Sequence, residues 1–296
     1  MSGYEGQADG GDDWASYWRD PHRPLEAMHA HFVRHVFHLH SHDAYSFAVT
    51  ESGAQRFRCR GGGHTSSTGM IMAFNPDDPH DGESAEELGF TYRIMHIGPE
   101  VVRDVLDDIT GGRARMPLFD RPVVDDPVLA RALRRLHPAL VGGADPLVRE
   151  ERLTAAVTAM VRRNASSGTG SAAPRELSGG GQTHAARRVR ALLDEAYERD
   201  LTAQDLADAA GCSRFALYRA FRAVYGMPPS DYQRLLRLRK ARGLLAAGHS
   251  AADAAALSGF ADQAHFHRWF VRSFGVTPGM FGRADGGTGA RPRVHA

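Results

Sequence analysis

The chain has only two cysteines among its 296 residues, Cys59 and Cys212, and they lie far apart. This spacing excludes a disulfide framework and is typical of a reducing compartment. No apolar run approaches the ~20 residues that a membrane helix needs. The segment Met1–Asp20 lacks the basic start and apolar core of a secretory signal. We therefore expect a cytoplasmic prokaryotic protein without membrane contact.

Net charge is also nearly absent, since 36 basic and 35 acidic residues leave +1 at neutral pH. This balance hides an asymmetry between the two ends of the chain. Residues 1–183 carry 19 arginines and 25 acidic residues, a net charge of −6, whereas residues 184–283 carry 15 basic and 9 acidic residues, a net charge of +6. A basic carboxyl-terminal part suits phosphate contacts, and the length favours two domains.

A first helix-turn-helix unit is predicted from Leu201 onward. Its first helix ends at Gly211, where a positive φ costs little because glycine has no Cβ. The Ser213 hydroxyl then caps a second helix over residues 214–224. One face of that helix is apolar at helical spacing and is expected to point inward. This face consists of Leu217, Ala220, Phe221 and Val224.

A second unit repeats this plan closer to the carboxyl terminus. Residues 251–257 and 262–274 are predicted as its two helices, with a turn at 258–260 between them. One long helix from about residue 230 to 247 joins the two units. Two units at this separation would read adjacent major-groove segments, about one helical turn apart on one face of the DNA.

This region resembles the AraC-type transcriptional regulators over about a third of the chain. The first unit matches at Leu206-Ala207, Gly211, Ser213, Leu217 and Phe221. The connecting helix matches over Arg237–Leu245, and the second unit matches at Ala254-Ala255, Gly259-Phe260, Asp262-Gln263, Phe266, Phe270, 274–278 and Phe281. The resemblance implies an all-α double helix-turn-helix domain that binds double-stranded promoter DNA.

By the same resemblance, the residues that read bases lie on the outward faces of the two recognition helices. Arg222 is expected on a phosphate, where it adds affinity without sequence choice. Arg219 and Arg268 suit guanine, and the alternative for both is an ion pair with a neighbouring acid. The expected base-reading residues are Phe215, Tyr218 and Arg219 in the first unit and Gln263, His265, His267 and Arg268 in the second.

The front half alternates apolar and polar residues in short segments, which predicts strands at 30–39, 45–50, 55–60, 70–74 and 90–97. Short strands separated by turns favour an antiparallel barrel or sandwich. This half also resembles, in part, the cupin barrel found at the front of many AraC-type regulators. The matching residues are His40-Ser41-His42, Gly53, Gly69, Asn75-Pro76 and His80. The glutamate that usually follows the second histidine is missing.

A helical hairpin is predicted after the strands. Asp126-Pro127 and Asp145-Pro146 each fit an N-cap followed by proline in the first turn, so helices are expected over 127–141 and 146–163. The simplest interpretation is that the hairpin covers one side of the barrel. The family resemblance implies instead that an exposed stripe of it pairs with a second subunit in a homodimer.

The expected fold class is multidomain α+β: a cupin-like antiparallel β-barrel with a helical hairpin, followed by an all-α double helix-turn-helix domain. The expected segments are a largely disordered amino terminus (1–26), an effector-binding and dimerisation domain (27–163), a flexible linker (164–183), the DNA-binding domain (184–283) and a disordered tail (284–296).

Sixteen histidines are many for this length, and five of them fall between residues 29 and 40. Along a strand, His38, His40 and His42 share one face because side chains alternate. His80 would approach from a neighbouring strand, and His96 is a further candidate. Imidazoles at His40, His42 and His80 would suit Zn²⁺, Ni²⁺, Cu²⁺ or Fe²⁺. The alternatives are hydrogen bonds to an organic effector, or satisfied polar groups at the barrel mouth.

A small barrel can also hold one organic ligand. The candidate lining residues are His40, His42, Tyr45, Phe47, Arg58, Phe74, His80 and Tyr92. The alternation does not fix the register through the turn at Asp43, so either Tyr45 or Ser46 would point inward.

These features predict a sequence-specific DNA-binding transcriptional regulator, not an enzyme, whose activity responds to a small effector or metal in the barrel. RNA polymerase is a further expected partner. The alternative is a metal-dependent cupin enzyme, or a metal sensor, fused to a DNA-binding domain. A constitutive regulator whose barrel serves only dimerisation is a third interpretation.

Overall fold

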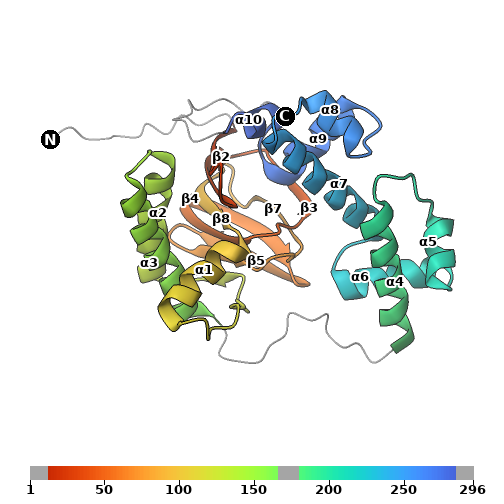
Figure 1. The fold of residues 1–296 in the computed structure, drawn as a ribbon, viewed down its shortest axis with the longest axis horizontal. Helices are drawn as coiled ribbons and strands as arrows, with labels where there is room; N and C mark the ends of the chain where they lie inside the picture. Colours follow the sequence, from red (N-terminus) through yellow and green to blue (C-terminus); the bar gives the residue numbers. More distant parts are fainter. Residues whose placement is uncertain (1–12, 166–179, 285–296) are drawn as a thin grey trace.

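The computed structural model describes residues 13–165 and 180–284, which form a strand-rich half and a helical half. In Figure 1, helices α2 and α3 cover one side of the sheet, and the helical half lies against the other side. The residues outside these ranges include most of the expected linker, at 166–179, and almost all of the expected tail, at 285–296.

All strand pairs in the described residues are antiparallel, and the main path of the sheet runs β1-β2-β8-β4-β6-β9. Strand β7 bridges β3 and β4, and β5 pairs with β4. The strands are β1 Trp14–Arg19, β2 Leu25–Phe32, β3 Phe37–His40, β4 Tyr45–Cys59, β5 Gly62–Ser67, β6 Ile71–Phe74, β7 His80–Ser84, β8 Phe90–Ile97 and β9 Val123–Val124.

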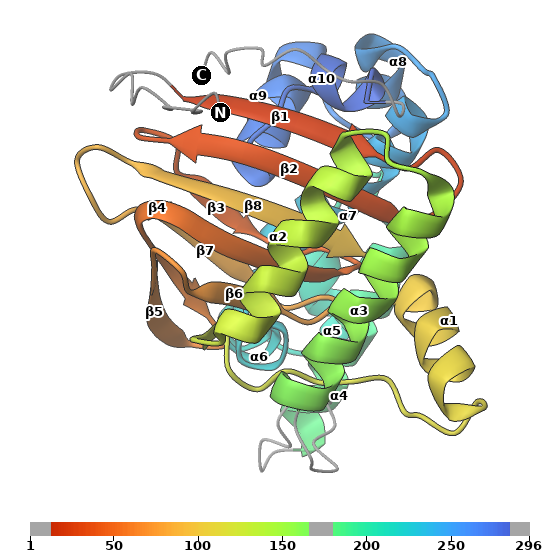
Figure 2. The same cartoon turned by 90° about the vertical axis from the view of Figure 1, so that its left-hand side faces the viewer.

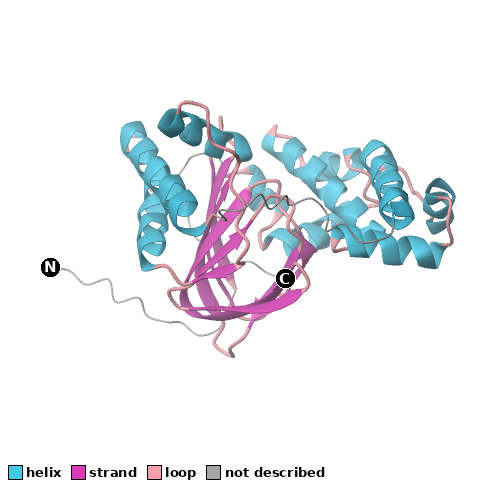
Figure 3. Cartoon of the chain, turned by 90° about the horizontal axis from the view of Figure 1, so that it is seen from below, coloured by secondary structure: helices cyan, strands magenta, loops and turns pink. Residues whose placement is uncertain are grey.

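The register of strand β4 against β8 shifts between Thr50 and Ser52, and the strand bends next to this point, at Gly53. Gly53 has φ +68°, and a Cβ there would lie 2.2 Å from the Gly89 carbonyl oxygen, so no larger residue fits. The first half of β4 pairs with β6 and β8, and the second half turns away to pair with β5 and β7. The result is the strongly curved sheet of Figure 3.

The sheet does not close, which corrects the expected barrel. Edge strands β1 and β9 each pair with a single neighbour, β2 and β6. The concave side is filled by apolar side chains of the connecting helix and of the second helix-turn-helix unit. Leu238 of the former and Phe266 and Phe270 of the latter share one core with Phe32 and Phe57 of the strands. Because a second domain already buries this face, closure of the sheet is not needed to remove it from water.

Several strand boundaries differ from those expected. Residues 30–39 form parts of two strands. The segments 45–50 and 55–59 belong to one strand, and β5 and β7 were not predicted. The expected disorder up to residue 26 is wrong for β1, which pairs with β2 along its whole length and buries Trp18. Residues 1–12 lie outside the described ranges.

The helices α1 Pro99–Thr110, α2 Pro127–Val141 and α3 Pro146–Asn164 cover the convex side of the sheet. Figure 2 shows α2 and α3 running antiparallel in front of the strands. The Asp126 carboxylate caps α2 through the amides of Val128 and Leu129, and Asp145 caps α3, as predicted. The leucine stripe of α2, made up of Leu129, Leu133, Leu136 and Leu140, is buried in one core with the sheet, which confirms that the hairpin covers it.

The helical half consists of α4 Gly180–Ala196, α5 Ala203–Ala210, α6 Arg214–Tyr225, α7 Pro229–Ala246, α8 Ala251–Leu257, α9 Gln263–Phe274 and α10 Pro278–Gly282. Both predicted helix-turn-helix units and the connecting helix are confirmed. The linker was expected to begin at residue 164 and end at 183, but Asn164 still belongs to α3 and α4 begins at Gly180. Within the described ranges, none of the helices is long and apolar enough to span a bilayer.

Candidate nucleic-acid interface and ligand cavities

The first recognition helix, α6, begins where the Ser213 hydroxyl accepts the Ala216 amide proton, at 3.3 Å. Its inward face is buried as predicted, apart from Val224, which is half-buried. Outward, the Phe215 side chain is 76% exposed and the Arg219 guanidinium lies over its ring at 5.7 Å. Exposing a large apolar ring to water is unfavourable in the free protein. A ring and a cation side by side suit contact with a base edge.

The outward face of α6 thus carries Phe215, Tyr218, Arg219 and Arg222, all exposed. None of the three positions Tyr218, Arg219 and Arg222 has an acidic partner in the described part of the chain. The alternative of an ion pair on a solvated face therefore finds no support for Arg219.

The second recognition helix, α9, is capped by Asp262, whose carboxylate accepts the His265 amide proton at 2.6 Å. Gln263, His267 and Arg268 are exposed at its amino-terminal half, where a recognition helix meets base edges. His265 is half-buried, and its Nε2 accepts the Trp269 indole proton at 2.8 Å. A neutral His265 must then carry its proton on Nδ1, which leaves a donor for a partner outside the protein.

Trp269 connects α9 to α7 and to β3. Arg234 of α7 lies 3.6 Å from the centre of its ring, and the His38 ring of β3 meets it edge-on at 4.8 Å. His38 therefore contacts the helical half and does not join the other histidines of its face, contrary to the expected alternation. The irregular pairing between Phe37 and His40 accounts for this.

Helix α7 makes polar side-chain contacts between the two halves. Arg242 donates to both Glu26 carboxylate oxygens at 2.6 Å, and the Tyr17 hydroxyl donates to the same carboxylate. Arg239 pairs with Asp77 and donates to the Ser41 hydroxyl at 3.2 Å. These contacts fix α7, and through it both recognition helices, to the strand-rich half.

Next to these ion pairs lies a cleft of about 420 Å³ between the halves, here named the interdomain cleft. The sheet side contributes Glu26, His42 and His96, and helix α7 contributes Arg239, Arg242 and Gly243. A volume of this size falls in the range that holds small organic ligands.

A second, smaller space of about 40 Å³, here named the histidine cavity, lies between the sheet and the carboxyl end of α9. Five of the expected ligand residues line it: His40, His42, Phe74, His80 and Tyr92. One nitrogen from each of His40, His42 and His80 lies within 4.8 Å of the others. The two spaces share His42 and His96.

The imidazoles of the histidine cavity are held neutral by burial. Burial lowers the pKa of His40, His42 and His80 below the usual value, and neighbouring imidazoles lower it further for His40 and His42. The pKa of His96 falls to about 4 for the same main reason.

Three expected lining residues lie elsewhere. Tyr45 and Phe47 point to the convex side, where the Tyr45 hydroxyl donates to the Pro117 carbonyl at 2.9 Å, and Arg58 is exposed. Ser46, the alternative to Tyr45, points inward and bonds His96 Nδ1 at 2.8 Å. Because side chains alternate along β4, one inward residue at 46 sends both neighbours outward.

The sequence patterns did not predict the other residues that line the histidine cavity. They are Met28, Phe37, Gln55, Phe57, Met72, Asp81, Gly82, Ile94, Ser273 and Phe274, together with His96, which was a candidate only for the metal set. Since side chains alternate along a strand, an inward Tyr92 indicates that Ile94 and His96 also point inward. No local pattern signals Ser273 and Phe274, because they come from the other domain.

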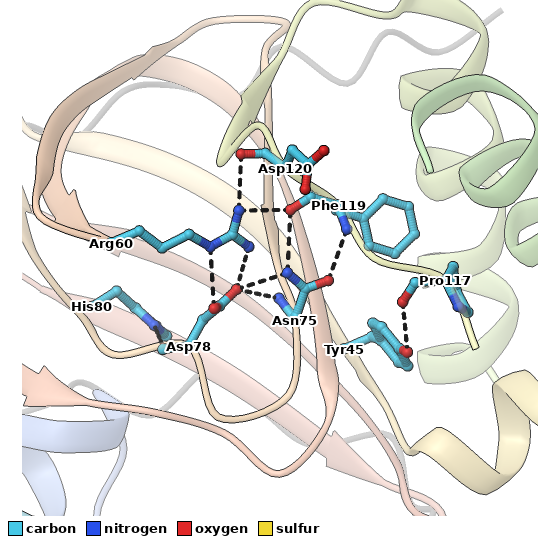
Figure 4. A network of polar contacts seen from close by, with 8 residues as sticks. All are labelled: Tyr45, Arg60, Asn75, Asp78, His80, Pro117, Phe119 and Asp120. Carbon is cyan, nitrogen blue, oxygen red and sulfur yellow. Dashed lines mark hydrogen bonds and ion pairs between the residues drawn. The ribbon is translucent and has the colours of Figure 1, made fainter. Parts of the chain in front are cut away.

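The loop before His80 is fixed by the polar network of Figure 4. The Asn75 side chain donates to Asp78 at 3.0 Å and accepts the Phe119 amide proton at 2.9 Å. Arg60 pairs with Asp78 and donates to the carbonyls of Phe119 and Asp120 at 2.7 and 2.9 Å. The connector after α1 therefore braces the loop that presents His80.

Two family models match the chain. The AraC-like ligand-binding domain matches residues 22–157, and a helix-turn-helix domain matches residues 206–284. The uncharacterized HTH-type transcriptional regulator YbfI of Bacillus subtilis is 28% identical over 83% of this chain and 87% of its own. The transcriptional activator RhaS of Escherichia fergusonii is 25% identical over 82% and 86%.

Solved structures of ToxT from Vibrio cholerae share the fold across both halves. One, bound to a naphthalenyl butenoic acid derivative, has a TM-score of 0.52 at 13% identity and covers 92% of this chain and all of ToxT. Another, bound to an unsaturated fatty acid, has a TM-score of 0.51 at 11% identity, with coverage of 91% and 94%. With both domains matched in order and relatives aligned along most of their length, the chain belongs to the AraC family of DNA-binding transcriptional regulators, with a ligand-binding amino-terminal domain.

Proposed function

We propose that this regulator is controlled by a small organic ligand in the interdomain cleft. The observation that carries the proposal is that the cleft has walls from both halves, with Glu26 and His96 on one side and Arg239 and Arg242 on the other. A ligand there would bind one arrangement of the halves better than another, which is the condition for a population shift. Two of the ToxT structures are complexes with small organic acids, an unsaturated fatty acid and a substituted butenoic acid, which supports a small organic ligand for this chain.

The output of the switch is the presentation of α6 and α9. The contacts from α7 and Trp269 hold α9 against β3, so a change at the cleft would alter the orientation of the second recognition helix relative to the first. We assign base contacts to Phe215, Tyr218, Arg219, Gln263, His265, His267 and Arg268, and phosphate contact to Arg222. All of these side chains are exposed except that of His265, which is half-buried.

We further propose that the protein acts in the cytoplasm as a homodimer. RNA polymerase is proposed as a further partner. The buried leucine stripe is unavailable for pairing, so the outer surface of α2–α3 would form the interface. Leu147 and Val148 at the start of α3 are exposed there. The relatives are regulators, which supports regulation over catalysis; an oxygen-dependent turnover by the metal-loaded protein would instead favour the cupin-enzyme alternative.

The experiment begins with binding-site selection on random DNA by the full-length protein. The selected site then serves to compare the wild-type protein with Gly243→Leu, because a Cβ at Gly243 meets nothing within 4 Å and a leucine would occupy part of the cleft. Ala191→Leu, at an exposed position of α4, is the matched control.

We expect Gly243→Leu to change operator affinity by about 5-fold or more, in the range of allosteric coupling, and Ala191→Leu to change it less than about twofold. Equal affinities for all three proteins would argue against control through the cleft. A selection that yields no preferred sequence would argue against specific DNA binding itself.

A further inference from the structure

We propose that His40, His42 and His80 bind one divalent transition-metal ion of the zinc class in the histidine cavity. Each offers one imidazole nitrogen, and the three nitrogens lie within 4.8 Å of one another. In a tetrahedral site with metal–nitrogen bonds of about 2.0–2.1 Å, two donors lie about 3.4 Å apart. Small rotations of the three rings would close that difference.

Two of the three rings are already oriented as metal ligands. His40 Nδ1 lies 2.7 Å from the His38 carbonyl oxygen, and His80 Nδ1 lies 2.8 Å from the Asp78 carbonyl oxygen. A carbonyl only accepts, so the proton sits on Nδ1 in each ring and the Nε2 lone pair is free. Metal-ligating histidines are commonly fixed in this way by a backbone carbonyl.

His42 supplies the third donor from among the other imidazoles. It is only 8% exposed, and its ring lies 4.9 Å from that of His40 and 5.4 Å from that of His80. The ring faces both the histidine cavity and the interdomain cleft, so an ion held by the three rings would lie where the two spaces meet.

The histidine cavity has room for a metal ion but is too small for an organic effector. About 40 Å³ is room for an ion with one or two waters, whereas organic ligand sites begin at about 300 Å³. The two ligands would therefore occupy adjacent spaces rather than compete for one.

The chemistry of the donors selects the metal. A donor set of three neutral imidazoles favours Zn²⁺, Ni²⁺ or Cu²⁺ over Mg²⁺ and Ca²⁺, which prefer oxygen. The Asp81 carboxylate also lines the cavity, where it accepts the Arg58 amide proton at 2.6 Å. The His96 ring, 4.2 Å from that of His42, or a water would take the fourth position. The nearest cation, Arg242, is compensated by the Glu26 carboxylate.

A regulatory consequence rests on the proposed function. The Phe274 ring of α9 lies 6.3 Å from the His40 ring and 6.1 Å from the His42 ring. A bound metal ion would draw the imidazoles together. This would change the packing of Phe274 and therefore the position of the second recognition helix.

The test is a titration of chelator-treated full-length protein with Co²⁺, followed by displacement with Zn²⁺. We expect one equivalent to bind, with visible absorption bands of nitrogen-coordinated Co²⁺ that Zn²⁺ removes. His42→Gln and His80→Gln are expected to weaken binding by more than about tenfold, while His249→Gln, at an exposed turn, leaves it unchanged. Circular dichroism melts identify variants that are folded.

The wild-type titration decides the proposal even if the variants fail to fold. Absence of bands and of binding in excess Co²⁺ would overturn it, as would equal loss of binding in His249→Gln. Operator affinity measured with and without Zn²⁺ tests the regulatory consequence separately. If no metal binds but Gly243→Leu still alters operator affinity, the metal site fails and the proposed function stands.

Discussion

Arg242 and Glu26, 216 positions apart in sequence, form a two-pronged ion pair in which one guanidinium nitrogen lies 2.6 Å from both carboxylate oxygens. Both side chains are largely buried, and the Arg242 guanidinium also lies over the rings of Phe274 and Phe281 at 4.9 and 5.1 Å. The pair therefore joins β2, α7, α9 and α10 at one point between the two halves.

Removing both members of this pair should cost less than the sum of removing each one alone. Arg242→Met leaves the Glu26 carboxylate buried with the Tyr17 hydroxyl as its remaining donor, and should lower the free energy of unfolding by about 3–5 kcal/mol. Arg242→Met combined with Glu26→Gln should lose less than the sum of the single changes. Urea unfolding measures all three. Additive losses would mean that the two side chains are not coupled.

Arg268 and Arg222 should differ in what they contribute to DNA binding. Arg268→Ala should cost about 1–3 kcal/mol and relax base preference at one position of the selected site. Arg222→Ala should weaken binding evenly across sequences and reduce its salt dependence. Arg135→Ala, an exposed arginine of α2, controls for the lost charge. Unchanged base preference in Arg268→Ala would remove that residue from base reading.

Leu147 offers a test of the proposed dimer. Its side chain is 77% exposed at the start of α3, and Leu88, in the turn before β8, is 78% exposed on another surface. Leu147→Asp should shift the mass measured by light scattering toward the monomer, because a charge would be buried in the interface. Leu88→Asp should leave the mass unchanged. A dimer that survives Leu147→Asp would place the interface elsewhere.

His137 should make stability depend on pH. Its ring is buried between α2 and the sheet, and burial, with Arg93 and His29 nearby, lowers its pKa to about 3. Glu51, which pairs with Arg93 and Arg134, is the acidic group on that side. The unfolded chain binds a proton on this ring below about pH 6.5 and the folded chain does not, so stability falls as pH falls through that window.

Between pH 6.5 and pH 5 this group should remove about 1.5 kcal/mol from the free energy of unfolding. His137→Gln should lose that part of the pH dependence, and His249→Gln should retain it. Urea unfolding at the two pH values gives the comparison. An identical pH slope in His137→Gln would show that folding does not change the proton affinity of this ring.

The sequence by itself determined the features that depend on near neighbours. Gly211 and Ser213 marked the first helix-turn-helix, and Asp126 and Asp145 marked the starts of the hairpin helices, because caps and left-handed turns are made by residues within a few positions. Alternation placed His40 and His42 on one face for the same reason. The family resemblance then supplied the exposed residues of both recognition helices.

Only the tertiary structure decided which face of β4 is the inner one. Tyr45 and Phe47 are as apolar as Phe57 and Tyr92, and two cores compete for them, one under α1–α3 and one under the second helix-turn-helix unit. Phe274 enters the histidine cavity from a helix more than 170 residues further along the chain than Tyr92. Such contacts depend on which surfaces bury one another, and no local periodicity records that choice.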